Sequence, residues 1–202
     1  GQQDNSSVAI PSSTNGRGID WSDWYRAAGC ESAYLAFDPD NPIDIYGGCY
    51  QGLINKLNIL TQKSRSIMAY EYLGLGSVPS DQKFRFNWNA PIFASPHDPS
   101  TIYHAGNVLF KTKDDGNSWD IISPDLTKND KEKHALGSVP FTNEAAGGEV
   151  YNTIMYAVES KHEAGTIWAG SDDGLIHITR NGGSKWKNVT PRSMDEGMVN
   201  SI

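Results

Sequence analysis

The sequence is poor in cysteine, in basic charge and in long apolar runs. Two cysteines in 202 residues exclude a small disulfide-rich fold. Against 24 Asp and Glu stand 17 Lys and Arg, for a net charge of −7. We expect no nucleic-acid partner, because binding to a phosphate backbone needs a concentrated basic patch. No run approaches the roughly 18 apolar residues of a spanning helix, so we expect no transmembrane segment.

Recognisable cofactor and metal motifs are missing as well. The five histidines are scattered without zinc-like spacing, and no loop carries the spaced oxygen ligands of a calcium site. Neither a phosphate loop nor a dinucleotide-binding glycine pattern occurs. We therefore expect no metal and no cofactor.

The N-terminal segment is polar and has no apolar core of a signal peptide. We expect residues 1–20 to be a flexible start of a mature chain whose leader was removed, which places the protein outside the cytoplasm, secreted or periplasmic. Such a chain can form a disulfide between Cys30 and Cys49. The two cysteines fall near each other if the strand before residue 38 pairs with the next one so that Phe37 lies opposite Asp44; the alternative is two separate thiols.

Glycine, proline and aromatic residues are plentiful, which favours short strands joined by many turns. Similar segments that begin with Ile45, Ile102 and Ile167 recur about every 60 residues, a period that suits a four-stranded propeller blade. We predict an all-β fold of about three four-stranded antiparallel blades in an incomplete ring, over 21–202. The expected blades are 31–70, 89–123 and 152–190, with the start of a fourth at 198–202.

The most specific local signal is a turn of the form S/T-x-D-x-G-x-x-W between the third and fourth strands. An Asp or Asn side chain can bond the amides of its own turn, Gly permits a positive φ, and Trp buries a large ring in the next strand. We expect a structural role, and not a catalytic one, for the residues of the two copies: Thr112, Asp114, Gly116 and Trp119, then Thr179, Asn181, Gly183 and Trp186.

With these turns the chain resembles the N-terminal part of large secreted bacterial proteins with BNR/Asp-box repeats and sortilin-like propellers. The resemblance spans 21–202 and is carried by the runs 24–32, 85–88, 95–99, 122–127 and 168–175. Many such proteins are labelled glycosyl hydrolases by similarity. The resemblance implies a propeller that serves as a binding scaffold for carbohydrate or protein, with a fragment of a glycoside hydrolase as the alternative.

Strand order puts the turns between second and third strands, and the connections between blades, on the side away from the Asp-box turns. A hydrolase would need two carboxylates there. The candidates are Glu31, Glu144, Glu149, Asp172 and Asp173. Asp172 is placed like the catalytic aspartate of xyloglucan-degrading Asp-box hydrolases, although Asp172 and Asp173 could equally form a turn. Expected ligand-binding residues are Arg85, Trp88, Asn107 and Tyr151.

Three blades are fewer than the four or more of a closed ring, and they leave two apolar end surfaces. We therefore expect either a part of a longer chain or an oligomer that covers these surfaces.

Overall fold

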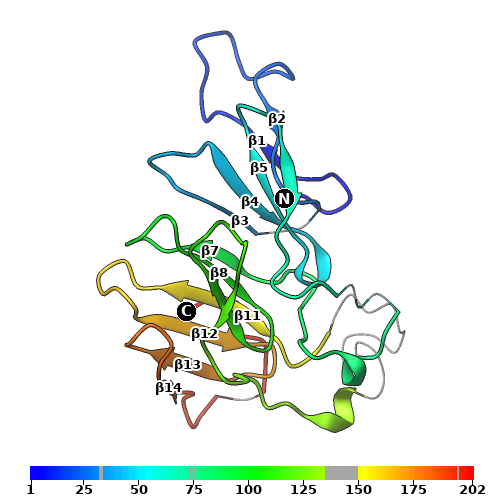
Figure 1. The fold of residues 1–202 in the computed structure, drawn as a ribbon, viewed down its shortest axis with the longest axis vertical. Coiled ribbons are helices and arrows are strands. Elements are labelled where there is room, and N and C mark those ends of the chain that lie inside the picture. The colour runs from blue at the N-terminus through cyan, green and yellow to red at the C-terminus, as the bar shows by residue number, and fades with distance from the viewer. Residues whose placement is uncertain (32–33, 73, 75, 135–149, 195) are drawn as a thin grey trace.

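A computed structural model describes residues 1–31, 34–72, 74, 76–134, 150–194 and 196–202 (Figure 1). Its main body is three four-stranded antiparallel sheets. The first sheet contains β3 (Leu35–Phe37), β4 (Asp44–Gly48), β5 (Ile54–Asn58) and β6 (Ser64–Ser66). The second contains β7 (Ile92–Ala94), β8 (Ile102–Ala105), β9 (Leu109–Thr112) and β10 (Asp120–Ile121). The third contains β11 (Ile154–Glu159), β12 (Ile167–Ser171), β13 (Ile176–Thr179) and β14 (Trp186–Asn188).

In each sheet the strands follow one another in chain order, and the sheets stack one after another (Figure 1). The predicted all-β architecture of four-stranded antiparallel sheets is confirmed. The predicted register of the first hairpin is wrong by one residue, because Phe37 pairs with Ile45 and not with Asp44. The turn takes up the extra residue: Asp38 O accepts from Asn41 N, and Asn41 O then accepts from Ile43 N, which delays the start of β4.

Three short 3₁₀ helices lie between strands of the described chain: η1 (Tyr50–Gly52), η2 (Pro79–Asp81) and η3 (Lys131–His134). The first is the turn from β4 to β5. The other two lie in the long connections that lead from one sheet to the next.

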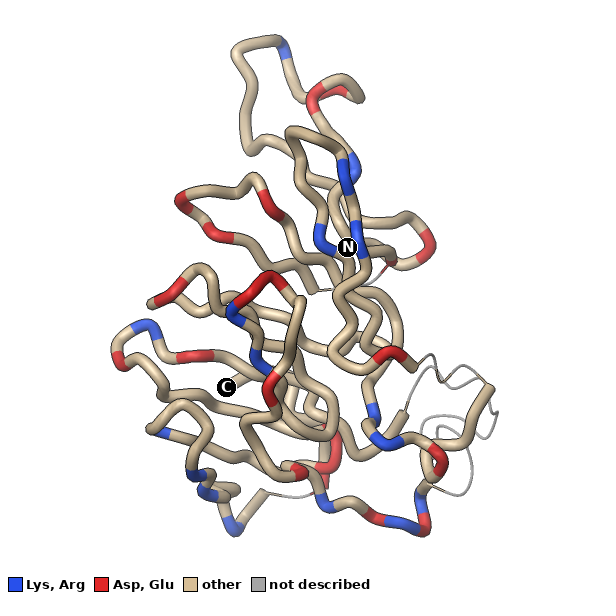
Figure 2. The backbone as a smooth tube through the Cα atoms, in the orientation of Figure 1, with Lys and Arg blue, Asp and Glu red and all other residues tan. Residues whose placement is uncertain are grey.

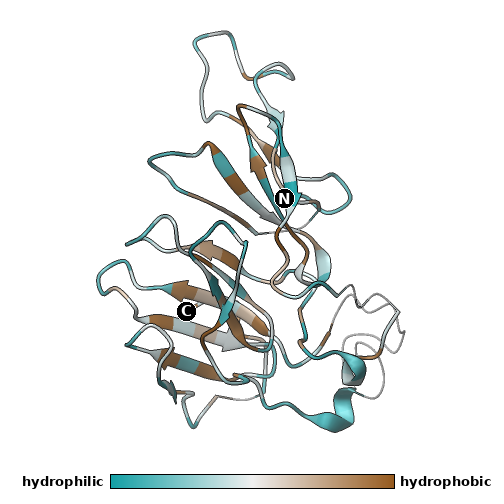
Figure 3. Cartoon of the chain, in the orientation of Figure 1, coloured by the Kyte–Doolittle hydropathy of each residue, from teal (hydrophilic) through white to brown (hydrophobic). Residues whose placement is uncertain are grey.

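Apolar side chains at alternate strand positions fill the spaces between the sheets. The strands therefore carry most of the brown colour in Figure 3. Tyr46 and Ile54 of the first sheet pack with Ile92 and Ile102 of the second. Leu109 of the second sheet belongs to a corresponding cluster with the third. Each fully buried side chain of this size contributes about 1.5–3 kcal/mol of transfer free energy.

The turn 112–119 locks the second sheet onto the first. Within it, Asp114 Oδ1 accepts from the Thr112 hydroxyl at 2.8 Å and from the Ser118 amide at 2.9 Å. The Ser118 hydroxyl donates to the other carboxylate oxygen. Together these bonds lower the pKa of Asp114 to about 2, and the one from the Ser118 side chain has the largest effect. The Trp119 indole N–H donates to Ile67 O, just beyond β6, at 3.0 Å.

The turn 179–186 repeats this arrangement between the third sheet and the second. Asn181 Oδ1 accepts from the Thr179 hydroxyl at 3.0 Å and from the Lys185 amide at 2.9 Å. The Trp186 indole N–H donates to Ile122 O, just beyond β10, at 2.8 Å. We call 112–119 and 179–186 the outer turns.

The N-terminal segment is more ordered than its polar composition predicts. The strands β1 (Val8–Ala9) and β2 (Tyr25–Arg26) pair with each other. Ser7 is fully buried because its carbonyl accepts from the Ala27 amide and its hydroxyl donates to Cys30 O. Cys30 and Cys49, the pair for which the sequence predicted a bridge, form a disulfide with a Cα–Cα distance of 4.9 Å.

Candidate functional site on the connection face

The turns between second and third strands and the connections between sheets lie on one side of the molecule, at the right of Figure 1. Because neighbouring strands are antiparallel, the second and fourth strands of each sheet end on the same side. The turns after the second strands and the connections after the fourth strands therefore lie together. We call this side the connection face. It contains the described residues 49–53, 67–72, 74, 76–91, 106–108, 122–134, 150–153 and 172–175.

Arg85 is the centre of a buried polar network on this face. Its Nη2 lies 2.7 Å from Asp125 Oδ2, and its Nε donates to Asn152 O at 3.2 Å. Its backbone amide donates to Asn107 Oδ1 at 3.0 Å, and Asn107 Nδ2 donates to Asp125 Oδ2 at 2.8 Å. Burial alone would raise the pKa of Asp125, but the bonds from Thr127, Arg85 and Asn107 outweigh it and lower that pKa.

Asp172 extends the network into the third sheet. Its side chain accepts from the Thr153 amide at 3.0 Å and from the Thr153 hydroxyl at 2.8 Å, and the residue is 3% exposed. Burial raises the pKa of Asp172 to about 7 against the effect of these bonds, and the charge of Asp173 adds to the rise. Asp172 is therefore a nearly buried carboxyl group whose pKa is raised toward neutral pH.

Asp173 is wholly buried. One of its carboxylate oxygens accepts from the Lys128 amide at 2.8 Å and from the Asn152 side chain; the other accepts from the Ser171 hydroxyl. Asn152 Oδ1 in turn lies 2.8 Å from His134 Nε2. The two aspartates thus hold the connections 122–134 and 150–153 in place.

The remaining candidate carboxylates do not join this pair in the described chain. Glu31 accepts from the Gln3 side chain at 2.9 Å and from the Asp4 amide at 2.7 Å, so it fastens the N-terminal segment. Glu144 and Glu149 lie outside the described residues.

Tyr151 belongs to a small polar group that the sequence did not suggest. It is 4% exposed, and its hydroxyl donates to Glu196 Oε1 at 3.1 Å. Lys133 Nζ lies 3.2 Å from the same oxygen and 4.9 Å from the centre of the Tyr151 ring. Tyr151 therefore presents little ring surface to a ligand.

Trp88 has a different setting, because it pairs with Tyr50 and both rings remain partly exposed. The ring centres are 5.0 Å apart and the ring planes are inclined by 31°. Tyr50 begins η1, the turn next to the disulfide, whereas Trp88 comes from the connection between the first two sheets. The ligand-binding residues expected from the sequence include Trp88 but not Tyr50, because no periodic signal links a turn residue with a connection.

Amide groups without a hydrogen-bond partner are found in the same part of the face. Gln51 follows Tyr50 in the left-handed region at φ 56° and is 3% exposed, and neither its Nε2 nor its Oε1 has a partner among the described residues. Within the same described part of the chain, Gln82 Nε2 and Asn89 Oδ1 are also buried without a partner. The Gln51 and Gln82 amides both border Gly74. A buried polar atom without a partner costs about 1–3 kcal/mol, which a ligand or water could recover.

The connection face thus has a closed part and a partly open part. Around Arg85, Asp172 and Asp173 the polar groups bond one another, while Tyr50 and Trp88 offer ring surface beside unsatisfied amides. Among the described residues, no group of three or more His, Cys, Asp or Glu is arranged to hold a metal ion.

Comparisons with known proteins bear on the fold. A xyloglucanase of the GH74 family from Xanthomonas campestris superposes with a TM-score of 0.54 at 16% identity, over 79% of this chain. The fold is a β-propeller. The GH74 enzyme of Niastella koreensis (17% identity, 78% of this chain, TM-score 0.44) and YCF48 from Cyanidioschyzon merolae (16%, 76%, 0.43) are also similar. No protein-family model and no curated protein sequence matches the chain.

The propeller likeness concerns only part of each of these proteins. The chain covers 23% of the Xanthomonas xyloglucanase, 22% of the Niastella enzyme and 38% of YCF48.

Proposed function

We propose that this chain is a segment of an exported Asp-box propeller that binds carbohydrate on its connection face, at Tyr50 and Trp88. The observation that carries the proposal is the partly exposed ring pair with unsatisfied amides in its surroundings. Aromatic faces pack against the apolar faces of sugar rings, and amide groups both donate to and accept from sugar hydroxyls.

The Asp-box assignment is supported by the outer turns, since Thr, Asp or Asn, Gly and Trp make the same contacts in both copies. The disulfide next to Tyr50 supports export, because such bonds persist in oxidising compartments. The described residues contain no helix that is both long and apolar enough to cross a membrane.

A fragment of a glycoside hydrolase is the second candidate, and one observation favours it. A general acid in such an enzyme needs a carboxyl group with a raised pKa, and the pKa of Asp172 is about 7. The contacts of Asp172 and Asp173 favour the binding scaffold, because hydrogen bonds from the chain itself occupy both side chains.

The test is calorimetric titration with neutral oligosaccharides, starting with those of xyloglucan because the Xanthomonas neighbour is a xyloglucanase. Trp88→Ala should weaken binding at least about fivefold, since one ring contact is commonly worth about 1 kcal/mol. Gln51→Gly should weaken it severalfold while keeping the fold, because glycine readily adopts the positive φ at this position.

Trp21→Ala is the matched control, since Trp21 lies in the N-terminal segment and is 81% exposed. Equal effects of Trp88→Ala and Trp21→Ala would refute the site. Hydrolysis of the sugar that disappears in Asp172→Asn, with binding unchanged in Trp88→Ala, would establish the hydrolase instead.

A further inference from the structure

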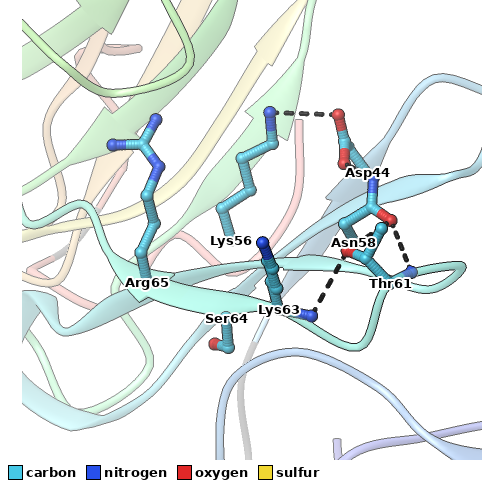
Figure 4. Close-up of a pocket in the computed structure, with 7 residues that line it drawn as sticks. All are labelled: Asp44, Lys56, Asn58, Thr61, Lys63, Ser64 and Arg65. Carbon is cyan, nitrogen blue, oxygen red and sulfur yellow. Dashed lines mark hydrogen bonds and ion pairs between the residues drawn. The ribbon is translucent and has the colours of Figure 1, made fainter.

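A pocket of about 420 Å³ lies at the outer hairpin of the first sheet, β5–β6, and is lined by polar and charged residues (Figure 4). It is on the opposite side from the connection face. Lys56 and Arg65 are paired across the two strands, so both side chains extend from the same side of the hairpin. Lys63 lies two residues before Arg65 and also points into this space (Figure 4).

Lys56 is neutralised within the pocket wall. Its Nζ lies 3.0 Å from Asp44 Oδ2 and 3.0 Å from Asp115 Oδ2, and only 13% of its side chain is exposed. Asp115 also accepts from the Tyr46 hydroxyl at 2.7 Å. This ion-pair group ties the outer turn to the first sheet.

Among the described residues, the other two cations form no ion pair. Arg65 donates to two neutral oxygens, Asp115 O at 2.6 Å and Asn117 Oδ1 at 3.1 Å. Lys63 is exposed and makes no ion pair with any described residue. In Figure 2 basic segments gather around this hairpin, on a chain whose net charge is −7. Arg65 and Lys63 thus bring two positive charges to one pocket without a direct ion pair to a described residue, although the charge of Arg65 also acts on Asp115. Together they provide a local attraction for an anion.

The groove between the second and third sheets is a natural counterpart of this pocket. Register makes Lys111 the equivalent of Lys56 and Asp120 the equivalent of Arg65. Both line a space of about 700 Å³ beside the outer turn 179–186, where Gly182 stands in the place of Asp115. The same scaffold therefore carries a carboxylate where the first pocket carries a guanidinium.

We propose that the first pocket binds an acidic saccharide, with its carboxylate or sulfate group at Arg65 and Lys63. Figure 4 places Arg65 at one end of the pocket and Asp44 with Asn58 and Thr61 at the other. The Asp44 carboxylate repels a bare anion but accepts hydrogen bonds from sugar hydroxyls. A sugar ring with one acidic group satisfies both ends, and the volume lies within the range of small-ligand pockets.

The experiment is calorimetric titration of the full chain with four probes: trigalacturonate, a sulfated carrageenan oligosaccharide, maltotriose and inorganic sulfate. We expect one of the two acidic saccharides to bind at least about tenfold more tightly than maltotriose and than sulfate, with affinity that falls as salt is raised. Which acidic saccharide binds identifies the charged group.

Lys63→Glu should reduce this affinity at least about tenfold, whereas Lys185→Glu, the same charge change at an exposed position of the other outer turn, should change it less than about twofold. Asp120→Arg should add a second binding event in the groove beside 179–186. Equal losses in Lys63→Glu and Lys185→Glu, or sulfate binding as tight as that of the saccharides, would overturn the proposal. These outcomes are independent of Tyr50 and Trp88, so this proposal and the connection-face site can fail separately.

Discussion

Two contacts join neighbouring sheets, the first to the second and the second to the third. One half of the contact is the same in both, and the other half differs. In both, an indole N–H donates to the carbonyl just beyond the last strand of the preceding sheet, and a glycine of the outer turn packs against that same residue. The fourth residue of the turn differs: Asp115 bonds Tyr46 and Lys56, whereas an added Cβ at Gly182 would meet nothing within 4 Å. The shared half therefore holds the sheets together, and the other half determines the chemistry of the groove beside them.

The strongest test of the shared half is Gly116→Ala. Gly116 has φ 77°, and an added Cβ would lie 2.6 Å from Ile67 Cβ. We expect the free energy of unfolding to fall by about 3 kcal/mol through backbone strain and overpacking together. Gly182→Ala is the matched control, since φ is 66° there but the space is open, so the loss should stay near about 1 kcal/mol in urea unfolding. Similar losses in both variants would contradict the packing role.

The second and third sheets also differ on the connection face, where Asn107 and Asp172 occupy equivalent turns. Asp172→Asn makes the third sheet like the second. Because the folded pKa of Asp172 is about 7 and an exposed Asp titrates near 3.8, this group contributes stability below about pH 4 that is lost as the pH rises toward 7. We expect the variant to lose less stability than the natural chain between pH 4 and pH 8, by up to about 4 kcal/mol.

Thermal unfolding across this pH range measures the difference. Asp125→Asn serves as the contrast, because hydrogen bonds lower the pKa of Asp125 and its effect on stability should have the opposite sign. Parallel pH curves for the natural chain and Asp172→Asn would show that Asp172 is ionised throughout.

Trp119→Phe and Trp186→Phe test whether the two contacts are equivalent. Each removes one indole N–H that donates to a backbone carbonyl and leaves that carbonyl without its donor. We expect each to lower the free energy of unfolding by about 1–2 kcal/mol, and the two values to agree closely in denaturant unfolding. Values that differ severalfold would mean that the groove chemistry, and not the shared half, decides the strength of the contact.

The smallest effect is expected from Asp115→Gly, which gives the first outer turn the glycine that the second outer turn has at the equivalent position, Gly182. It removes a partly exposed ion pair with Lys56 and the acceptor of the Tyr46 hydroxyl. The loss in free energy of unfolding should be about 1 kcal/mol or less, because exposed pairs contribute little. Added salt should reduce the difference between variant and natural chain; a difference that salt does not change would show that the hydroxyl bond dominates.

Most of the architecture could be predicted because short sequence patterns recur at equivalent positions of each sheet. Ile45, Ile102 and Ile167 each lie in the second strand of a sheet, and each outer turn has its Trp near the last strand. The register of the first hairpin and the β1–β2 pair were missed, since both depend on backbone hydrogen bonds of irregular segments that no periodic pattern encodes.

The site was harder to predict because sequence indicates residue type but not burial. Asp172 and Asp173 do lie on the connection face with Arg85 and Asn107, yet the chain's own donors surround them. Tyr50 and Gln51 were not counted among the ligand-binding residues, because they follow an ordinary strand. A glutamine in a tight turn that requires positive φ is the one local signal that could have drawn attention to them.

The Trp119 and Trp186 contacts give the stack of sheets a polarity. The second and third sheets each donate an indole N–H to the sheet before them, and the acceptors, Ile67 O and Ile122 O, lie just beyond the last strands of those preceding sheets. Val189 has the equivalent position in the third sheet. The first sheet has no Trp at the corresponding turn, 60–64, and its outward side packs instead against Ala28. Through this contact the side of one stack that carries the indole donor can meet only the side of another that carries the carbonyl acceptor, which is a head-to-tail arrangement. Two donor sides or two acceptor sides facing each other could not form the bond.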